Sequence, residues 1–215
     1  MDDASVEYRH RAKIVDIGKR LYDKGLVVAG DGNLSVRVGP NKILATPTGV
    51  CKGFLKPWEL PVIDMSGRVL YGDIPPSSEI AMHLLIYRIR ADISAIVHAH
   101  PPIATGFSAA CTALDKPLIA ETVVTMGSVP LAQYATPGTR EVPDSIAQLV
   151  PNHDAILLAN HGAVTYNKNL ETAYWKMETV EHLAKITLVT SMLGKESPIS
   201  AENIGKLLET VRLRG

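Results

Sequence analysis

Two histidines separated by a single residue, His98 and His100, lie in a stretch of apolar and β-branched residues. Alternate residues of a strand point to the same face about 6.5–7 Å apart, so both imidazoles can converge on one cation. By itself, the pair is equally consistent with two structural histidines. His161 ends a second apolar stretch in Ala-Asn-His-Gly, where the glycine lets the backbone approach a ligand. Three imidazoles at two strand ends favour a borderline metal such as zinc.

Glu79 follows two prolines and two serines, a sequence typical of a helix start with a serine N-cap. By itself, this carboxylate would be a favourable partner for the helix dipole. Beside a metal it could serve as a fourth ligand, and it could also leave the ion and take up a proton. A general acid/base next to a Lewis acid is the arrangement that enolate chemistry requires. The other histidines have no second metal-ligand candidate at a suitable spacing in the sequence, and we expect them to be structural. They are His10, His83, His153 and His182.

Three short polar segments could together bind an anion. They are Gly32-Asn33-Leu34-Ser35, Thr46-Pro47-Thr48-Gly49 and Ser77-Ser78. Each supplies hydroxyls, an amide or backbone N–H groups, and the last lies at the predicted helix N-terminus, where phosphate is favoured. None of them matches the P-loop or the dinucleotide fingerprint. Each segment would be an ordinary turn in isolation, so the predicted phosphate site depends on their occurring together.

The elements that must position these residues follow from periodicity and turn signals. The patterns predict helices over about 6–24, 79–90 and 170–193, and a hairpin over 62–71. They predict strands over 34–38, 42–46, 93–100, 154–160 and 163–165. Because helices and strands are interspersed without a regular βαβ rhythm, we expect an α/β fold with a central mixed β-sheet sandwiched by helices. No linker divides the chain, so we expect one domain over residues 1–215, with a C-terminal tail from about 195.

The composition excludes several classes of protein. Among 215 residues, 22 Lys and Arg balance 22 Asp and Glu, so no global positive field would draw the chain to nucleic acid or anionic lipid. An anionic ligand must therefore be held by a local site. Two cysteines, Cys51 and Cys111, argue against a disulfide scaffold and for a reducing compartment. With neither a signal-peptide pattern nor a long apolar run, we expect a cytoplasmic protein without membrane or nucleic-acid partners.

The ordered motifs Gly-Asn-Leu-Ser, Thr-Pro-Thr-Gly, Pro-Ser-Ser-Glu, His-Ala-His and Asn-His-Gly resemble those of the class II aldolase/adducin family. The resemblance runs from the first predicted helix to about residue 195 and includes residues 134–139. It implies a mixed sheet between helices, and a homotetramer with active sites between subunits. It also implies a zinc-dependent aldolase that cleaves a ketose 1-phosphate, such as L-fuculose 1-phosphate, to dihydroxyacetone phosphate and an aldehyde through a metal-stabilised enediolate.

The site residues that the resemblance implies fall into two groups. Glu79 would be both a zinc ligand and the catalytic acid/base. The zinc site would consist of Glu79, His98, His100 and His161. The substrate phosphate would be bound by Gly32, Asn33, Thr48, Gly49, Ser77 and Ser78.

The sequence departs from the family pattern on the aldehyde side of the site. The family's proton-transferring tyrosine from the next subunit aligns near Glu121, with no tyrosine close by, and a C-terminal tyrosine is absent. An aromatic residue on that side becomes Pro137. No Schiff-base lysine is needed, and the lysines mostly lie among polar residues or near turns.

Several other functions are consistent with parts of the pattern. A ribulose-phosphate 4-epimerase of this family would carry an aspartate where Glu79 stands, whereas a methylthioribulose-phosphate dehydratase is less well discriminated. A non-catalytic adducin-like protein would lack the metal set. A histidine-ligated zinc hydrolase would leave the three polar segments unexplained.

Overall fold

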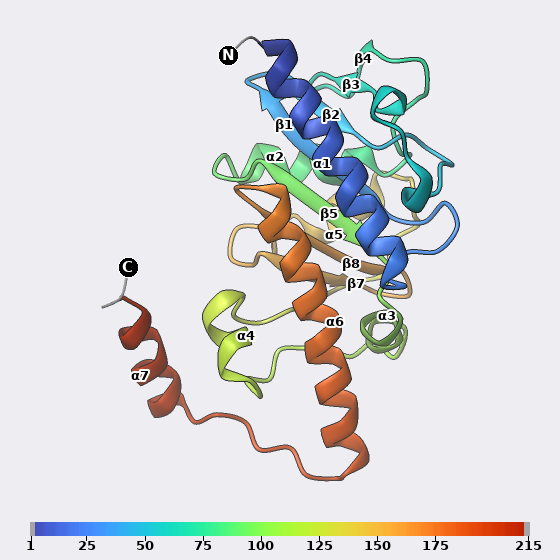
Figure 1. Ribbon diagram of the computed structural model, residues 1–215. Coiled ribbons are helices and arrows are strands. Elements are labelled where there is room, and N and C mark those ends of the chain that lie inside the picture. The colour runs from blue at the N-terminus through green and yellow to red at the C-terminus, as the bar shows by residue number, and fades with distance from the viewer. Residues whose placement is uncertain (1–2, 213–215) are drawn as a thin grey trace.

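The computed structural model describes residues 3–212, and within them an eight-stranded sheet forms the centre of the molecule (Figure 1). The strands follow the order β4-β3-β2-β1-β5-β8-β7-β6. All neighbours pair antiparallel except β6 and β7, which are parallel, so the sheet is mixed as predicted. The strands are β1 (Asn33–Gly39), β2 (Lys42–Ala45), β3 (Val62–Ile63), β4 (Val69–Tyr71), β5 (Ala95–Ala99), β6 (Leu131–Ala132), β7 (Ala155–Leu158) and β8 (Gly162–Asn167).

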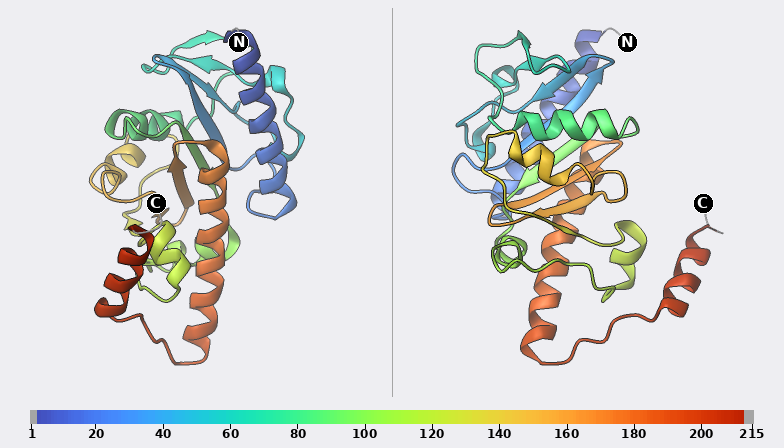
Figure 2. Two further views of the ribbon diagram at one scale, coloured as in Figure 1. Left: turned by 60° about the vertical axis from the view of Figure 1, so that its left-hand side comes forward. Right: turned by 180° about the vertical axis from the view of Figure 1, so that it is seen from behind.

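Helices cover both faces of this sheet, which confirms the predicted architecture. α1 and α6 lie against one face, and α2 and α5 lie against the other (Figures 1 and 2). The helices are α1 (Asp3–Asp23), α2 (Ile80–Ile89), α3 (Pro102–Ala109), α4 (Ala120–Thr125), α5 (Glu141–Ile146), α6 (Leu170–Met192) and α7 (Ala201–Arg212). Two 3₁₀ turns, Lys52–Phe54 and Pro57–Glu59, precede β3.

Strand β5 shows how the two helical layers divide the core. Its residues Val97 and Ala99 pack in the layer with α1 and α6, whereas Ile96 packs in the layer with α2 and α5. Because strand side chains alternate between faces, His98 points to the same side as Ile96. The sheet therefore directs His98 toward α2, the helix that begins directly after Glu79.

The start of α2 differs from the prediction. We expected a serine N-cap with Glu79 in the first turn, but Glu79 itself is the N-cap residue, and its side chain makes no capping hydrogen bond. Ser77 Oγ instead accepts a hydrogen bond from the Glu79 backbone N–H at 3.3 Å. The Glu79 carboxylate is thus free to turn toward the histidines.

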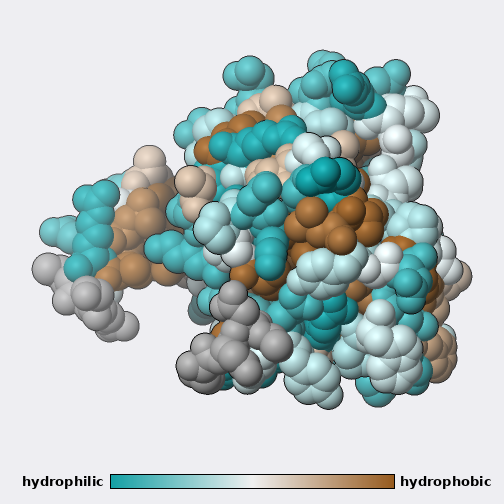
Figure 3. All heavy atoms as spheres, turned by 90° about the horizontal axis from the view of Figure 1, so that it is seen from above, coloured by the Kyte–Doolittle hydropathy of each residue, from teal (hydrophilic) through white to brown (hydrophobic). Residues whose placement is uncertain are grey.

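The short elements after β5 were not predicted. α3, α4, α5 and β6 span between two and eight residues, too few to show a period. The expected tail also contains α7, which stands apart from the main body and approaches it near α4 (Figure 2). Its apolar side chains include the exposed Leu208 and Val211, and Figure 3 shows apolar atoms on this outlying part. Among the described residues, no helix is both long and apolar enough to cross a membrane.

Candidate functional site

The three predicted histidines lie together at the centre of the sheet. The nearest ligand atoms of His98, His100 and His161 are all within 4.8 Å of one another. The ring centroid of His98 lies 5.0 Å from that of His100 and 4.8 Å from that of His161. The structure therefore brings together a histidine pair and a third histidine that lie about sixty residues apart in sequence, which is a possible three-histidine metal site.

The pairing of three central strands accounts for this convergence. β5 lies between β1 and β8, with His98 opposite Asn33 on one side and opposite Val164 on the other. His161 lies in the turn that joins β7 to β8, where Asn160 adopts a positive φ of 55°. Asparagine tolerates this left-handed conformation better than most residues. The tight turn thus holds His161 beside the end of β5.

Glu79 completes the cluster from the helical layer. Its Oε2 lies 3.2 Å from His98 Nε2, and its Oε1 lies 3.1 Å from His161 Nε2. Its Oε1 is nonetheless buried without a hydrogen bond among the described residues. Because a buried carboxylate oxygen without a donor is costly, this atom lies where a bound cation would compensate it.

The protonation of His98 is fixed by a backbone partner. Its Nδ1 lies 2.9 Å from the Ala163 carbonyl oxygen, which can only accept, so Nδ1 carries the proton. In the neutral ring, the lone pair of His98 Nε2 then faces Glu79 Oε2. His100 Nε2 lies only 3.1 Å from the same His98 Nε2. His100 is oriented similarly, since its Nδ1 lies 3.3 Å from Asp31 Oδ2. Acceptors that face one another in this way fit a shared metal ion.

The electrostatics of the cluster favour the forms that bind metals. Burial is the main cause that lowers the pKa of His100 to about 4, and the charges of His98 and His161 lower it further. For Glu79, burial opposes ionisation and is the largest single effect. The adjacent imidazoles of His98 and His161 outweigh it when they are protonated, and so hold the pKa of the Glu79 carboxyl below its usual range. At neutral pH, His100 is therefore an uncharged imidazole that can donate a lone pair to a metal, and Glu79 is an anion.

A cavity of about 220 Å³ opens beside the cluster. All six residues that were predicted to bind phosphate line it, together with Glu79, His100 and His161. His98 lies behind them and is fully buried. The complete lining is Gly30, Asp31, Gly32, Asn33, Pro47, Thr48, Gly49, Lys52, Ser77, Ser78, Glu79, His100, Pro137 and His161. The structure thus brings the three polar segments and the metal-ligand candidates to one hollow.

Backbone pairing holds two of the polar segments side by side. Thr48 N–H donates to the Pro75 carbonyl at 3.0 Å, and Ser77 N–H donates to the Thr46 carbonyl at 3.1 Å. The third segment depends on Gly32, which has a φ of +68° and approaches the His98 carbonyl closely, since a Cβ there would lie 2.7 Å from that oxygen. These constraints bring the segment ends to the rim of one cavity.

Asn33 lines the cavity, and its side chain also makes two contacts that the sequence did not reveal. Its Nδ2 donates to Glu79 Oε2 at 2.9 Å, and its Oδ1 lies 2.5 Å from His83 Nε2. The amide thus lies between the Glu79 carboxylate and a buried histidine. Burial lowers the pKa of His83 to about 3, so this imidazole is neutral.

Lys52 was not recognised from the sequence. Its side chain is buried, and Nζ donates to the carbonyls of Gly30 at 2.8 Å and Val50 at 2.6 Å. Burial is the main cause that lowers its pKa. The lysines were predicted to lie mostly among polar residues or near turns, and Lys52 is an exception that lines the cavity. Its two carbonyl partners hold the ammonium group in place. Gly30 lies just before the first polar segment and Val50 just after the second, so Lys52 links the two segments.

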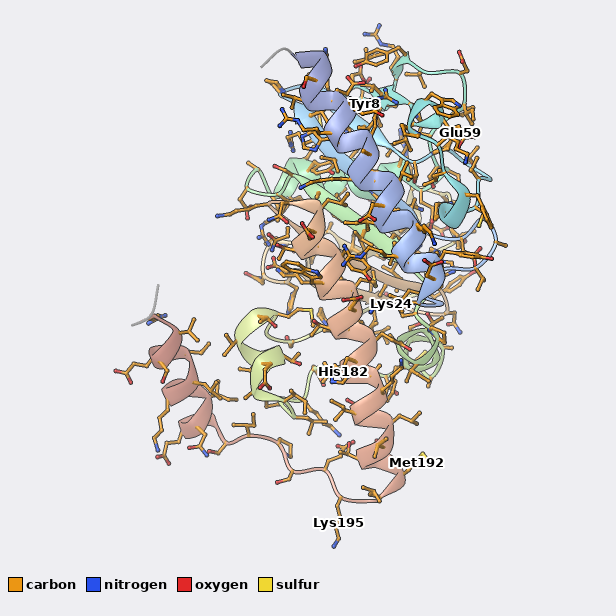
Figure 4. All side chains as sticks on the ribbon, viewed as in Figure 1. Tyr8, Lys24, Glu59, His182, Met192 and Lys195 are labelled. Atoms are coloured by element: carbon orange, nitrogen blue, oxygen red, sulfur yellow. The ribbon has the colours of Figure 1, made fainter. Side chains whose placement is uncertain are left out.

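The remaining predicted residues fall outside the cluster. His153 Nδ1 lies 2.9 Å from the Leu149 carbonyl, and His182 is exposed on α6 (Figure 4). Both positions agree with the expected structural roles. Glu121 lies on α4 and is not among the described residues that line the cavity, whereas Pro137 is.

Gly162 offers a test of how closely the site depends on backbone packing. A Cβ at this position would lie 2.5 Å from the Ala99 carbonyl oxygen and 2.6 Å from His100 Cδ2. Gly162→Ala is therefore expected to displace His100 and to weaken zinc binding by about 10–100-fold, measured by competition with a chelating dye. Gly205→Ala is the matched control, because a Cβ there has open space in α7. Unchanged zinc affinity in Gly162→Ala would contradict the described packing.

Comparisons with known proteins agree with this site. A family model described as the class II aldolase and adducin N-terminal domain matches residues 12–188. The chain is 37% identical over 210 residues to 3-oxo-tetronate 4-phosphate decarboxylase of Pectobacterium atrosepticum, covering 94% of each protein. It is 36% identical to L-fuculose phosphate aldolase of Methanocaldococcus jannaschii, covering 86% of this chain and 99% of that one. A solved L-fuculose 1-phosphate aldolase superposes with a TM-score of 0.87 at 32% identity, covering 94% of this chain and 95% of the other. The chain therefore belongs to the class II aldolase and adducin family.

Proposed function

We propose that this protein is a zinc-dependent lyase that acts on a small phosphorylated substrate with a carbonyl group and breaks the carbon–carbon bond between the carbon adjacent to the carbonyl and the next carbon. The observation that carries the proposal is the pair of facing acceptors, Glu79 and His98, beside a cavity lined by phosphate-binding groups. Zinc would be held by Glu79, His98, His100 and His161. As a Lewis acid it would polarise the substrate carbonyl and stabilise the negative charge left when the bond breaks.

The same cavity is suited to the phosphate. Gly32, Asn33, Thr48, Gly49, Ser77 and Ser78 would bind it. Ser77 and Ser78 directly precede α2, where unpaired N–H groups and the helix dipole favour an anion. The buried ammonium of Lys52 adds a local positive charge to the cavity, although the net charge of the whole chain is zero. A local site of dipoles, hydroxyls and one cation therefore supplies what the neutral chain lacks.

Glu79 is the proposed acid/base. Its Oε2 is held by Asn33, whereas its Oε1 has no hydrogen bond among the described residues and could exchange a proton when it is not bound to the metal. In the lyase reaction, the carbon that loses its neighbour must gain a proton before the product leaves. The Glu79 carboxylate could take up a proton from solvent and then deliver it to that carbon.

The chemistry of the departing group favours decarboxylation. Loss of carbon dioxide from 3-oxo-tetronate 4-phosphate leaves the enediolate of dihydroxyacetone phosphate, which is also the species left by aldol cleavage of a ketose 1-phosphate. Aldol cleavage additionally requires a group that removes a proton from the hydroxyl of the departing aldehyde, whereas decarboxylation does not. The absence of a tyrosine near Glu121 and the proline at 137 support decarboxylation, because this reaction needs no group that acts on a departing aldehyde. The decarboxylase similarity over 94% of both chains also supports it.

Aldol cleavage of a ketose 1-phosphate, such as L-fuculose 1-phosphate, is the second candidate. The glutamate at position 79, where the family's epimerases have aspartate, favours it over epimerisation, and the aldolase similarity supports it. We further propose a cytoplasmic homotetramer, with residues of a neighbouring subunit closing the aldehyde side of the cavity.

A product assay separates these reactions. The zinc-loaded protein is expected to release dihydroxyacetone phosphate from 3-oxo-tetronate 4-phosphate faster than from L-fuculose 1-phosphate, and a chelator should abolish both activities. Release is measured through NADH oxidation by a coupled dehydrogenase, with an enzyme-free control for spontaneous decarboxylation. An epimerised ribulose phosphate or a dehydrated methylthioribulose phosphate, without dihydroxyacetone phosphate, would contradict the proposal.

Replacing Glu79 tests the acid/base assignment. Glu79→Gln is expected to retain the fold by circular dichroism but to lower kcat by about 10²–10⁴-fold, because the amide cannot exchange the proton. Glu121→Gln serves as the matched control on α4 and should stay within about threefold of the original kcat, in the range of surface substitutions. Full activity in Glu79→Gln would remove Glu79 from the mechanism.

A further inference from the structure

A chain of buried hydrogen bonds runs from Asn33 at the candidate site into the core, through His83, Ser35 and Tyr87, to which the proposed function assigns no role. His83 is 1% exposed and lies between two polar partners. Its Nε2 lies 2.5 Å from Asn33 Oδ1, and its Nδ1 lies 2.7 Å from Ser35 Oγ. Ser35 Oγ in turn lies 2.9 Å from the hydroxyl of Tyr87. The chain of buried side chains thus starts at the Glu79 carboxylate, passes through Asn33, His83 and Ser35, and ends at Tyr87 within α2.

The direction of every hydrogen bond in this chain follows from its first member. The ionised Glu79 carboxylate only accepts, so Asn33 must present its NH₂ group to Oε2. The remaining Asn33 oxygen only accepts, so His83 must carry its proton on Nε2. In a neutral imidazole, Nδ1 is then an acceptor, and it takes the Ser35 hydroxyl proton. Ser35 therefore accepts from Tyr87.

Resting on the proposed function, we infer that His83 is a positioning residue for Glu79 and acts through Asn33. As an N–H donor, it fixes which end of the Asn33 amide faces the carboxylate. With that donor in place, Glu79 Oε2 is held and Oε1 stays free. Without it, the amide can rotate and bring its oxygen against the carboxylate, where two acceptors repel.

This arrangement makes the two Glu79 oxygens chemically different. Oε2 accepts from Asn33 at 2.9 Å, whereas Oε1 lies 3.1 Å from His161 Nε2 without a hydrogen bond among the described residues. A proton acceptor that must act at one position benefits when its other oxygen is already engaged. His83 therefore affects the reaction step more than substrate binding, because Asn33 is the one member of the six proposed phosphate-binding residues that contacts it in this chain of bonds.

Three substitutions separate positioning from simple core packing. His83→Leu removes the donor and is expected to lower kcat by about 10–100-fold while KM changes by less than about threefold. His83→Gln can still donate to Asn33 and should recover most of the lost kcat. Tyr87→Phe is the matched control at the far end of the chain, because it removes a buried hydroxyl without altering the Asn33 amide. It should lower the melting temperature but leave kcat within about threefold.

Two kinetic outcomes would overturn the inference. One is a kcat for His83→Leu equal to that of the original protein. The other is an equal loss of kcat in the His83→Leu, His83→Gln and Tyr87→Phe variants, which would indicate packing alone.

A spectroscopic measurement needs neither activity nor a variant that folds. In the protein labelled with ¹⁵N-histidine, long-range ¹H–¹⁵N correlation is expected to show His83 as the neutral tautomer protonated on Nε2. The Nδ1-protonated tautomer, or the imidazolium, would overturn the inference even if the lyase activity is present. Conversely, the Nε2-protonated tautomer in a protein without lyase activity would leave the hydrogen-bond direction intact and reject only the proposed function.

Discussion

A buried carboxylate that faces imidazole lone pairs is the constraint on which the rest of the structure depends. In the neutral ring, the proton of His98 is on the nitrogen that faces the Ala163 carbonyl, so its other nitrogen presents a lone pair to Glu79. Burying such acceptors against one another costs several kcal/mol unless a cation or a shared proton lies between them. A cation bound there would therefore both stabilise the centre of this protein and make it reactive.

The sheet supplies the rigidity that this arrangement needs. Asn33 and His98 are cross-strand neighbours on β1 and β5, and β8 supports His98 from the other side. Both faces of the sheet are covered by apolar layers, so these strands have little freedom to separate. Gly32 and Gly162 allow backbone to approach the end of β5 where a side chain would not fit. The reactive groups thus lie on the rigid part of the fold, and the cavity opens through loops.

Much of this site could be predicted from the sequence because it depends on local periodicity. The alternation of strand residues was enough to pair His98 with His100, and the Asn-His-Gly turn marked His161 as the third member. The predicted N-cap of α2 was wrong by one or two residues, because Ser77 and Ser78 have side chains that can cap a helix, whereas the N-cap residue is Glu79, whose side chain makes no capping hydrogen bond.

The partners that depend on tertiary burial could not be predicted. Nothing near Lys52 indicates that its ammonium group turns inward to two carbonyls. His83 lies on an apolar helix, where a structural histidine is the ordinary expectation, and its link to Glu79 exists only because β1 brings Asn33 between them. The same contact gives Asn33 a role beside the carboxylate that its motif does not reveal.

The central claim is that one zinc ion lies between the three histidines and Glu79. X-ray absorption spectroscopy of the protein reconstituted with one equivalent of zinc tests it most directly. The account predicts one tightly bound ion with three nitrogen neighbours and at least one oxygen neighbour at about 2.0–2.2 Å, and loss of the nitrogen neighbours when His98 is replaced by alanine. A zinc ion with only oxygen neighbours, or one whose spectrum is unchanged in His98→Ala, would contradict the account.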